Sequence, residues 1–388
     1  MLRIDQRIIL VTRPTRQQQL IAKYGTPGQA AFYVSRSRSL HAGARVGGVR
    51  ALAKAQGPSQ RKMMAEIARA EDLGAADAMS DLRVVEEQSR TYEQIVAGLR
   101  QELDFDIPVQ VVDRMYVPKM VFGPKDVIVA VGQDGLVANV AKYAVGLPII
   151  GVNPDPAQYD GVLLPFQRNQ ARSAVQRALE GRAKIRLVTL AEARLNDGQR
   201  LLAFNDLFVG ARSHVSARYR LETSTGAERQ SSSGIIVSTG AGSTGWLSSI
   251  LNMARGIAAL PGQAPGRPQT AAGPQRLFGS NLPPLRRRVS ASDLFAQTFE
   301  TPLAASFQMQ WEDRKLAYVV REPFASKSSS ASIIAGMLGD NESLIIESLM
   351  GPEGTIFSDG VEADFLPFPE GMIATITVAR ETARLVVA

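Results

Sequence analysis

The sequence predicts an α/β domain with a parallel sheet, followed by a β-rich, sandwich-like second domain. Two apolar runs, Val127–Val131 and Leu147–Asn153, are separated by a glycine turn and a helix-like stretch, which is the spacing of a βαβ unit. Both runs have the apolar character of strands in a buried parallel sheet. After about Phe166, short strand-like runs follow one another without long helices between them, which favours antiparallel pairing. At 388 residues the chain is long enough for two domains with separate cores.

The first domain is expected over residues 1–165, and an apolar strand at residues 7–12 begins it. A helical pattern follows near Gln17–Tyr24, and Val109–Val112 is typical of another strand.

Helical spacing also predicts a helix within residues 61–104. One stripe of its later part carries Val85, Tyr92, Ile95, Val96 and Leu99. Residues 35–85 are expected to be an insertion, because their first half is rich in Arg, Gly, Ala and Ser with little periodicity.

The second domain is expected over residues 166–365. Its strand-like runs before the middle of the domain are 185–190, 201–209, 215–221 and 234–238. Residues 261–290 are rich in Pro, Gly and Arg, so we expect a mobile basic loop there. The segment from 308 onward is again mostly short strands, and we expect residues 366–388 to return to the first domain.

Composition excludes several kinds of chemistry. The chain has no Cys, which rules out disulfides, thiolate metal sites and a Cys nucleophile. The only two histidines are His41 and His214, and His214 is expected to be structural. The formal charge of +7 speaks to non-specific association, and because the excess lies largely in two irregular stretches we expect no nucleic-acid partner. No apolar run reaches the length of a membrane span, and no secretory signal is evident, so we expect a cytoplasmic protein without a membrane partner.

The first candidate site is the turn Gly132-Gln133-Asp134-Gly135, which follows a strand and opens a helix. Such a turn presents backbone N–H groups to a phosphate, and the helix dipole favours the anion. The spacing matches neither the Walker loop nor the dinucleotide-binding glycine motif, and from spacing alone a plain turn is an equal alternative. Asp134 favours function, because a carboxylate beside phosphate is costly unless it accepts a proton or holds Mg²⁺.

The second candidate site is Ser238–Trp246, a run of small hydroxyl and glycine residues directly after a strand. Such a run lets a flat ligand approach the backbone closely. Its centre also resembles the nucleophile elbow of serine hydrolases, but both histidines precede Ser243, and the hydrolase order places the histidine last. A flexible linker is the other alternative, and the apolar residues on both sides make it the weaker one.

Two further polar groups are ambiguous from the residues alone. Asn205-Asp206 interrupts an apolar stretch, so it is either a solvent-facing bulge or a ligand contact, and the residues by themselves favour the bulge. Ser358-Asp359-Gly360 is typical of an ordinary hairpin turn.

Taken in order, these segments resemble the NAD kinase family of the diacylglycerol kinase-like superfamily. The family's Gly-Gly-Asp-Gly-Thr loop corresponds to residues 132–136, its next strand to 148–153, and its Asn-Glu pair to 205–206. Its Gly-Ser-Thr segment corresponds to 242–244. The resemblance is closest to the mitochondrial type. Features shared with that branch are Asn153-Pro154-Asp155-Pro156, Ser232-Ser233-Gly234, Trp246, Arg321-Glu322-Pro323 and Asp359-Gly360.

The resemblance implies ATP- and Mg²⁺-dependent phosphorylation of the adenosine ribose 2′-hydroxyl of NAD to give NADP. Asp134 inherits the role of general base, and Gly132, Gln133, Gly135 and Leu136 that of the nucleotide phosphate loop. The residues implied to bind NAD are Asn205, Asp206, Ser243, Thr244, Gly245 and Ser249. Further candidates are Asn153, Asp359 and Gly360. The resemblance also implies NAD and ATP as partners, Mg²⁺ entering with ATP and no direct protein ligand for it, and a homodimer.

The loop departs from the family pattern at two positions. Gln133 replaces a glycine and would crowd the loop if the position needs a positive φ. Leu136 replaces a threonine and removes a hydroxyl donor, which predicts weaker or different triphosphate binding. Two alternatives therefore stay open: a superfamily kinase that acts on another hydroxyl of a sugar, nucleoside or lipid, and a catalytically silent NAD(H)-binding protein.

Overall fold

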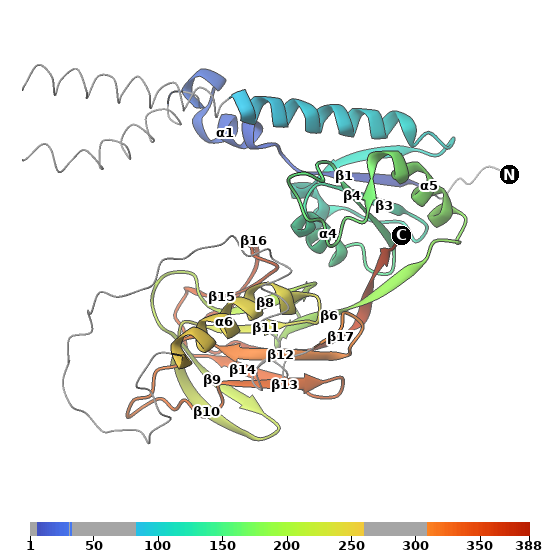
Figure 1. Ribbon diagram of the computed structural model, residues 1–388. Helices are drawn as coiled ribbons and strands as arrows, with labels where there is room; N and C mark the ends of the chain where they lie inside the picture. The colour runs from blue at the N-terminus through green and yellow to red at the C-terminus, as the bar shows by residue number, and fades with distance from the viewer. Residues whose placement is uncertain (1–5, 31, 33–82, 260–308) are drawn as a thin grey trace, which may run out of the picture. The chain divides into compact units, whose positions relative to one another are not determined.

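The structure is a computed structural model, and it describes residues 6–30, 32, 83–259 and 309–388. The chain divides into two units (Figure 1). The first comprises Met1–Val140, Pro148–Lys184 and Val386–Ala388, and the second comprises Ala141–Leu147 and Ile185–Leu385. The expected basic loop, and the expected insertion apart from residues 83–85, lie outside the described residues.

The first unit is built on a parallel sheet. Its described strands are β1 (Ile8–Thr12), β2 (Val109–Asp113), β3 (Val127–Val131), β4 (Pro148–Asn153) and β5 (Phe166–Gln167). Their spatial order is β2-β1-β3-β4-β5, and each neighbouring pair is parallel. The chain therefore winds outward on one side of β1 and then crosses to β3 on its other side. That reversal point between β1 and β3 is where sheets of this strand order bind ligands.

Helices flank this sheet. They are α1 (Arg16–Tyr24), the helical residues 83–102, the 3₁₀ helix η2 (Arg114–Lys119), α4 (Asp134–Ala141) and α5 (Arg168–Leu179). Thr15 and Gln18 form a reciprocal capping box at the start of α1, so the helix begins where its first free N–H groups find acceptors. Gln18 also donates to Glu93 at 3.0 Å, which places α1 beside the helix over 83–102 (Figure 1).

The predicted apolar patterns of this unit are confirmed in the described residues. All five residues of β3 are buried, as expected for a sheet covered on both faces. On the helix over 83–102, Val85, Tyr92 and Leu99 are buried, and Ile95 and Val96 are half-buried.

The second unit is β-rich. Its described strands are β6 (Ile185–Leu195), β7 (Arg200–Ala203), β8 (Asp206–Ala211), β9 (Ala217–Thr223), β10 (Gly226–Ser232), β11 (Ile235–Ser238), β12 (Lys315–Val320), β13 (Ala335–Gly339), β14 (Leu344–Ser348), β15 (Gly354–Ser358), β16 (Val361–Pro367) and β17 (Ile373–Val386). One antiparallel sheet has the order β13-β12-β11-β8-β15-β16. A second set runs β10-β9-β14-β17, with the β6-β7 hairpin paired to β17.

One apolar core joins the two sheets of the second unit. It includes Val237 and Ile356 from the first sheet and Tyr219 and Ile376 from the second. The expected fold class, a parallel α/β domain plus a sandwich-like β domain, is confirmed. Helix α5 packs with the first unit although it lies in the range 166–365, and of the last segment only Val386–Ala388 belongs to the first unit. The domain ranges themselves stay predictions.

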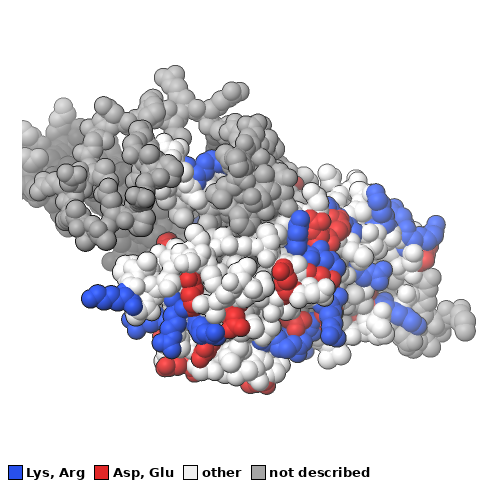
Figure 2. Space-filling view, turned by 90° about the horizontal axis from the view of Figure 1, so that it is seen from below, with Lys and Arg blue, Asp and Glu red and all other residues white. Residues whose placement is uncertain are grey.

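Basic and acidic side chains lie intermixed on the face shown in Figure 2. Surface ion pairs of the described residues include Arg314–Asp340 and Arg186–Glu312. The formal charge of +7 therefore does not gather into one basic surface on this face. None of the described helices has the length and apolar character that crossing a bilayer requires.

Candidate functional site

The glycine turn of the first unit lies at the reversal point of the sheet. In the register of β1 and β3, Val11 is opposite Ala130, so Arg13 and Gly132 both follow at the carboxyl ends of adjacent strands. The Gly132 N–H donates to the Val152 carbonyl at 3.3 Å, which ties the turn to the end of β4. The turn thus occupies the ligand-binding end of the sheet.

The backbone of this turn is unstrained. Neither glycine has a positive φ, and Gln133 is exposed and also lacks one, so its side chain is accommodated without strain. A Cβ on Gly135 would meet no atom within 4 Å, which leaves the first turn of α4 open to close approach by a ligand. A Cβ on Gly132 would lie 3.0 Å from a Leu136 methyl carbon, so the Leu136 side chain packs closely against that glycine.

Asp134 is the first residue of α4 and is half-buried. Its Oδ1 accepts a hydrogen bond from the Leu163 N–H at 2.7 Å. The helix dipole also favours a carboxylate at this position. Among the described residues no group donates to Oδ2, so one carboxylate oxygen is held in place and the other is left for a ligand.

Leu136 and Asn153 both have structural contacts within the first unit. Leu136 is 2% exposed and packs beneath Gly132, so an apolar side chain stands where the family pattern has a hydroxyl. The Asn153 amide donates to the Tyr159 carbonyl at 3.0 Å and accepts from the Asp155 N–H at 3.0 Å. Asn153 therefore shapes the loop after β4, the same loop that brings Leu163 to Asp134.

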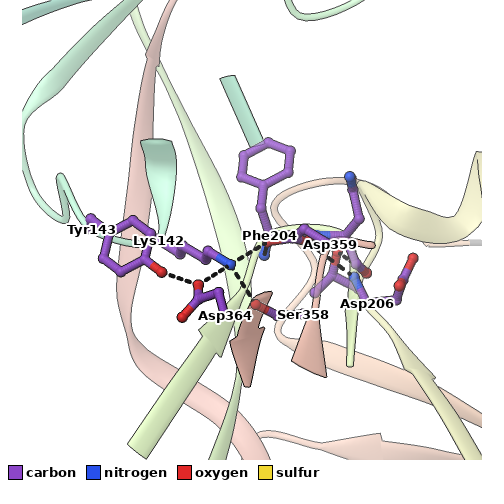
Figure 3. Close-up of polar contacts among 9 residues, drawn as sticks. Lys142, Tyr143, Phe204, Asp206, Ser358, Asp359 and Asp364 are labelled. Carbon is purple, nitrogen blue, oxygen red and sulfur yellow. Dashed lines mark hydrogen bonds and ion pairs between the residues drawn. The ribbon is translucent and has the colours of Figure 1, made fainter. Parts of the chain in front are cut away.

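In the second unit, the Asn205-Asp206 turn connects β7 and β8 and faces inward. Asp206 is 7% exposed, so the solvent-facing bulge that the residues alone favoured is wrong. Asp359 explains the difference. Its carboxylate accepts hydrogen bonds from the N–H groups of Phe204, Asn205 and Asp206 at 3.2, 2.6 and 3.4 Å (Figure 3). Bonding of this kind replaces the water that a solvent-facing turn would need.

The interpretation of residues 358–360 as an ordinary turn is therefore incomplete. Asp359 and Gly360 do adopt positive φ values of 55° and 68° in a two-residue hairpin loop between β15 and β16. The Asp359 side chain, however, is only 1% exposed, and its N–H donates to the Asp206 carbonyl at 2.9 Å. Asp359 thus fixes the backbone of residues 204–206 through these four hydrogen bonds, and we call this arrangement the clamp.

Lys142 supplies the positive charge of this cluster. It directly follows α4, belongs to the second unit, and has a side chain 1% exposed. Its Nζ donates to the Ser358 hydroxyl at 2.6 Å and forms ion pairs with Asp364 at 2.8 Å and Asp359 at 4.0 Å (Figure 3). Tyr143 also donates to Asp364. One lysine thus faces two carboxylates, with Asp206 as a third nearby.

Burial, together with the neighbouring carboxylates, shifts the pKa values of this cluster. Burial and the negative charge of Asp359 raise the pKa of Asp206 to about 7. Burial also raises the pKa of Asp359, whereas the Lys142 ammonium and the three backbone N–H groups oppose that rise. Among the described residues no group donates to the Asp206 carboxylate, so it is the polar group of this cluster best placed to meet a ligand.

The glycine-rich segment packs against the same turn. The Thr239 N–H donates to the Asn205 carbonyl at 2.9 Å, and its hydroxyl donates to the Phe204 carbonyl at 2.6 Å. A Cβ on Gly242 would lie 2.1 Å from the Asn205 carbonyl oxygen, so only glycine fits there. Two motifs separated by more than thirty residues are thereby joined in one unit.

The other predicted residues of this segment lie at its edge. The Ser243 hydroxyl donates to the Gly240 carbonyl at 2.7 Å, while Thr244, Gly245 and Ser249 are exposed. Trp246 opens α6 (Trp246–Ala258) and stacks on Phe208, with ring centroids 5.8 Å apart and planes at 11°. The exposed backbone and hydroxyls around Gly245 leave room for a flat ligand beside an aromatic ring.

The predicted residues therefore fall into two groups, with Gly132–Leu136 and Asn153 in the first unit and the rest in the second. Sequence reasoning did not single out several residues that contact the predicted ones, namely Arg13, Lys142, Tyr143 and Asp364. Their partners are more than thirty residues away in the chain, so local spacing could not reveal them. The signal available for Lys142 was a charged residue directly after an apolar helix.

Comparison with known proteins adds structural likenesses. No protein-family model matches the chain, and no curated protein sequence matches it. It is similar to yeast NADH kinase complexed with NADH, with 15% identity and a TM-score of 0.46 over 74% of this chain and 67% of that one. It is also similar to an NAD kinase from Archaeoglobus fulgidus in complex with ATP, with 15% identity and a TM-score of 0.46 over 75% of this chain and 88% of that one.

Proposed function

We propose that the chain is an NAD kinase-like phosphotransferase that moves the γ-phosphoryl group of MgATP to the 2′-hydroxyl of the adenosine ribose of NAD. The observation that carries the proposal is Asp134. One of its oxygens is held by the Leu163 N–H, and the other meets no donor among the described residues, at the reversal point of a parallel sheet. The ordered segments that resemble the family support the same activity.

Asp134 acts as general base in this proposal. The free carboxylate oxygen of Asp134 accepts the proton of the ribose 2′-hydroxyl. At the same time the oxygen of that hydroxyl forms a bond to the γ-phosphorus. The bond from this phosphorus to the bridging oxygen breaks, and ADP leaves with Mg²⁺. The open first turn of α4, beside Gly135, presents N–H groups to the transferring phosphate.

The second unit binds the dinucleotide. Asn205 and Asp206 offer an amide and a carboxylate to ribose hydroxyls or base amino groups, and the clamp at Asp359 holds them in place. Ser243, Thr244, Gly245 and Ser249 line the adenosine. We further propose a cytoplasmic homodimer with no nucleic-acid or membrane partner and no direct protein ligand for Mg²⁺.

The test is formation of NADP from NAD and MgATP by the full chain, with Asp134→Asn as the control. The expected result is product from the parent protein and formation that is about 10²- to 10⁴-fold slower in the variant. Absence of NADP from well-folded parent protein contradicts the proposal. Running NADH and a panel of sugars, nucleosides and lipids in parallel identifies a different acceptor.

A second candidate, a catalytically silent NAD(H)-binding protein, is favoured by one observation. The buried Leu136 places a methyl group, and no hydroxyl, under the phosphate loop. Calorimetry decides between the two, because a silent protein binds NAD(H) without binding ATP. Restored activity in Gln133→Gly with Leu136→Thr would identify the loop as the cause of silence.

A further inference from the structure

Arg13 lies at the end of β1, level with Gly132 at the end of the neighbouring strand β3. A Cβ on Gly132 would be 3.3 Å from the Arg13 Cδ and 3.5 Å from its Nε, so the arginine side chain passes directly beside the glycine turn. This is the reversal point of the sheet, where the topology places ligands.

The Arg13 guanidinium has no anionic partner among the described residues. It is half-buried, its Nε is buried without an acceptor, and one of its five N–H groups donates to the Tyr159 hydroxyl at 3.1 Å. Arg7, just before the same strand, shows the usual arrangement, since it pairs with Asp126 at 2.6 Å. A partly buried cation whose N–H groups lack acceptors costs desolvation free energy, and a bound anion offsets that cost.

Two tyrosines hold Arg13 in this position. Its guanidinium carbon lies 5.3 Å from the centre of the Tyr92 ring and 5.9 Å from that of Tyr159. The Arg13 N–H donates to the Tyr92 hydroxyl at 3.0 Å, and that hydroxyl donates to the Val131 carbonyl at 2.8 Å. Burial raises the pKa of Tyr92 to about 12, so this hydroxyl stays neutral and does not neutralise the arginine. The charge is therefore preorganised, and no anion of the described residues compensates it.

We propose that Arg13 binds a phosphate group of the nucleoside triphosphate at the Gly132–Gly135 turn, and that it supplies the donor which Leu136 cannot. A guanidinium suits this task because its planar donors match phosphate oxygens in pairs. The inference rests on the proposed function for the identity of the nucleotide, and it adds a specificity-determining residue to the donor site. The ligand chemistry is a terminal or bridging phosphate, not a base.

The experiment is calorimetric titration of the full chain with MgATP, tripolyphosphate and adenosine. The variants are Arg13→Gln and Arg13→Lys, with Arg16→Gln as the matched control, because Arg16 is exposed three residues away. We expect Arg13→Gln to bind MgATP and tripolyphosphate about ten- to a hundredfold more weakly while adenosine binding is unchanged. Arg13→Lys keeps the charge but loses the paired donors, so it should retain part of the affinity for MgATP and tripolyphosphate. If the glutamine variant fails to fold, an affinity of the lysine variant below that of the parent supports the proposal, and an unchanged affinity contradicts it.

Three results would overturn the proposal. They are a change of less than about twofold in phosphate binding by Arg13→Gln, an equal loss of adenosine affinity, and no phosphate-dependent binding by the parent protein. The proposed function is tested separately by product formation. Arg13-dependent binding of MgATP without NADP formation rejects only the proposed acceptor chemistry, and NADP formation with an unchanged KM for ATP in Arg13→Gln rejects only the role of Arg13.

Discussion

The two units differ in how the polar groups of their predicted site residues are used. Within the described part of the first unit, Asp134 has one oxygen that meets no donor, and one of the five side-chain N–H groups of Arg13 is engaged. In the second unit, Asp359 accepts three backbone N–H groups and Lys142 has three partners. Polar groups with free hydrogen-bonding capacity suit chemistry on a substrate, and polar groups whose hydrogen bonds are satisfied suit a rigid support for binding. The contrast predicts that substitutions in the first unit change rates and phosphate affinity, whereas those in the second change stability and acceptor affinity.

The largest expected effect is on Asp134. Asp134→Asn keeps the hydrogen bond from Leu163 but cannot take up a proton, so the rate of NADP formation should fall by about 10²- to 10⁴-fold. The affinity for NAD should change little. Steady-state kinetics with calorimetry checks both quantities, and a loss of binding equal to the loss of rate would place Asp134 among the supporting residues instead.

The next effect is on the stability of the second unit. Lys142→Met leaves the buried Asp359 and the half-buried Asp364 without their cation, so the free energy of unfolding should fall by about 3–5 kcal/mol. Lys315→Met is the matched control, because Lys315 pairs with Asp313 at the surface at 3.1 Å with a side chain 39% exposed. That change should be within about 1 kcal/mol. Equal changes in urea unfolding of the two variants would contradict the assignment of a buried charge cluster.

Asp206 gives the second unit a pH dependence. Its pKa is raised to about 7 in the folded chain and is about 4 when unfolded, so between these values the folded state binds the extra proton. The stabilisation from this group is complete below about pH 4 and is lost as the pH rises to about 7. Asp206→Asn removes this part of the pH dependence of the free energy of unfolding. The part removed should amount to about a few kcal/mol at most between pH 4 and pH 7. The measurement is the free energy of unfolding of parent and variant at pH 4.5 and 7.5. The same difference between the two proteins at both pH values would show the assignment to be wrong.

The smallest expected effect is on acceptor affinity. Asp359→Asn weakens the clamp on residues 204–206, so the dissociation constant for NAD should rise about tenfold while that for MgATP stays unchanged. Asp340→Asn is the control, since that carboxylate is exposed and pairs with Arg314. If MgATP affinity falls in step with NAD affinity, the clamp supports the whole fold and not the acceptor.

Much of this architecture follows from local patterns. The run Val127–Val131, the glycine turn and the following apolar run predicted a parallel βαβ unit, because both runs are uninterrupted and apolar and their separation leaves room for a crossover helix. The capping pair Thr15 and Gln18 marks the start of α1 in the same way.

The polar clusters could not be predicted in that way. Asp359 and Phe204 are 155 positions apart, and Lys142 and Ser358 are 216 apart. Nothing in the local spacing of Ser358-Asp359-Gly360 distinguishes a solvent-exposed turn from a buried clamp, since the φ requirement is the same for both. Burial was decided by strand pairing, which brought β8 beside β15 and turned Asp206 inward.

The most direct measurement is transfer of label from γ-³²P MgATP to NAD, with the product identified by the position of its phosphate. The parent chain should yield NADP labelled at the 2′-position of the adenosine ribose, and Asp134→Asn should form it about 10²- to 10⁴-fold more slowly while still binding NAD. Label that remains in ATP, or that appears only as free phosphate, in the presence of folded parent protein with bound NAD would contradict the proposed transfer.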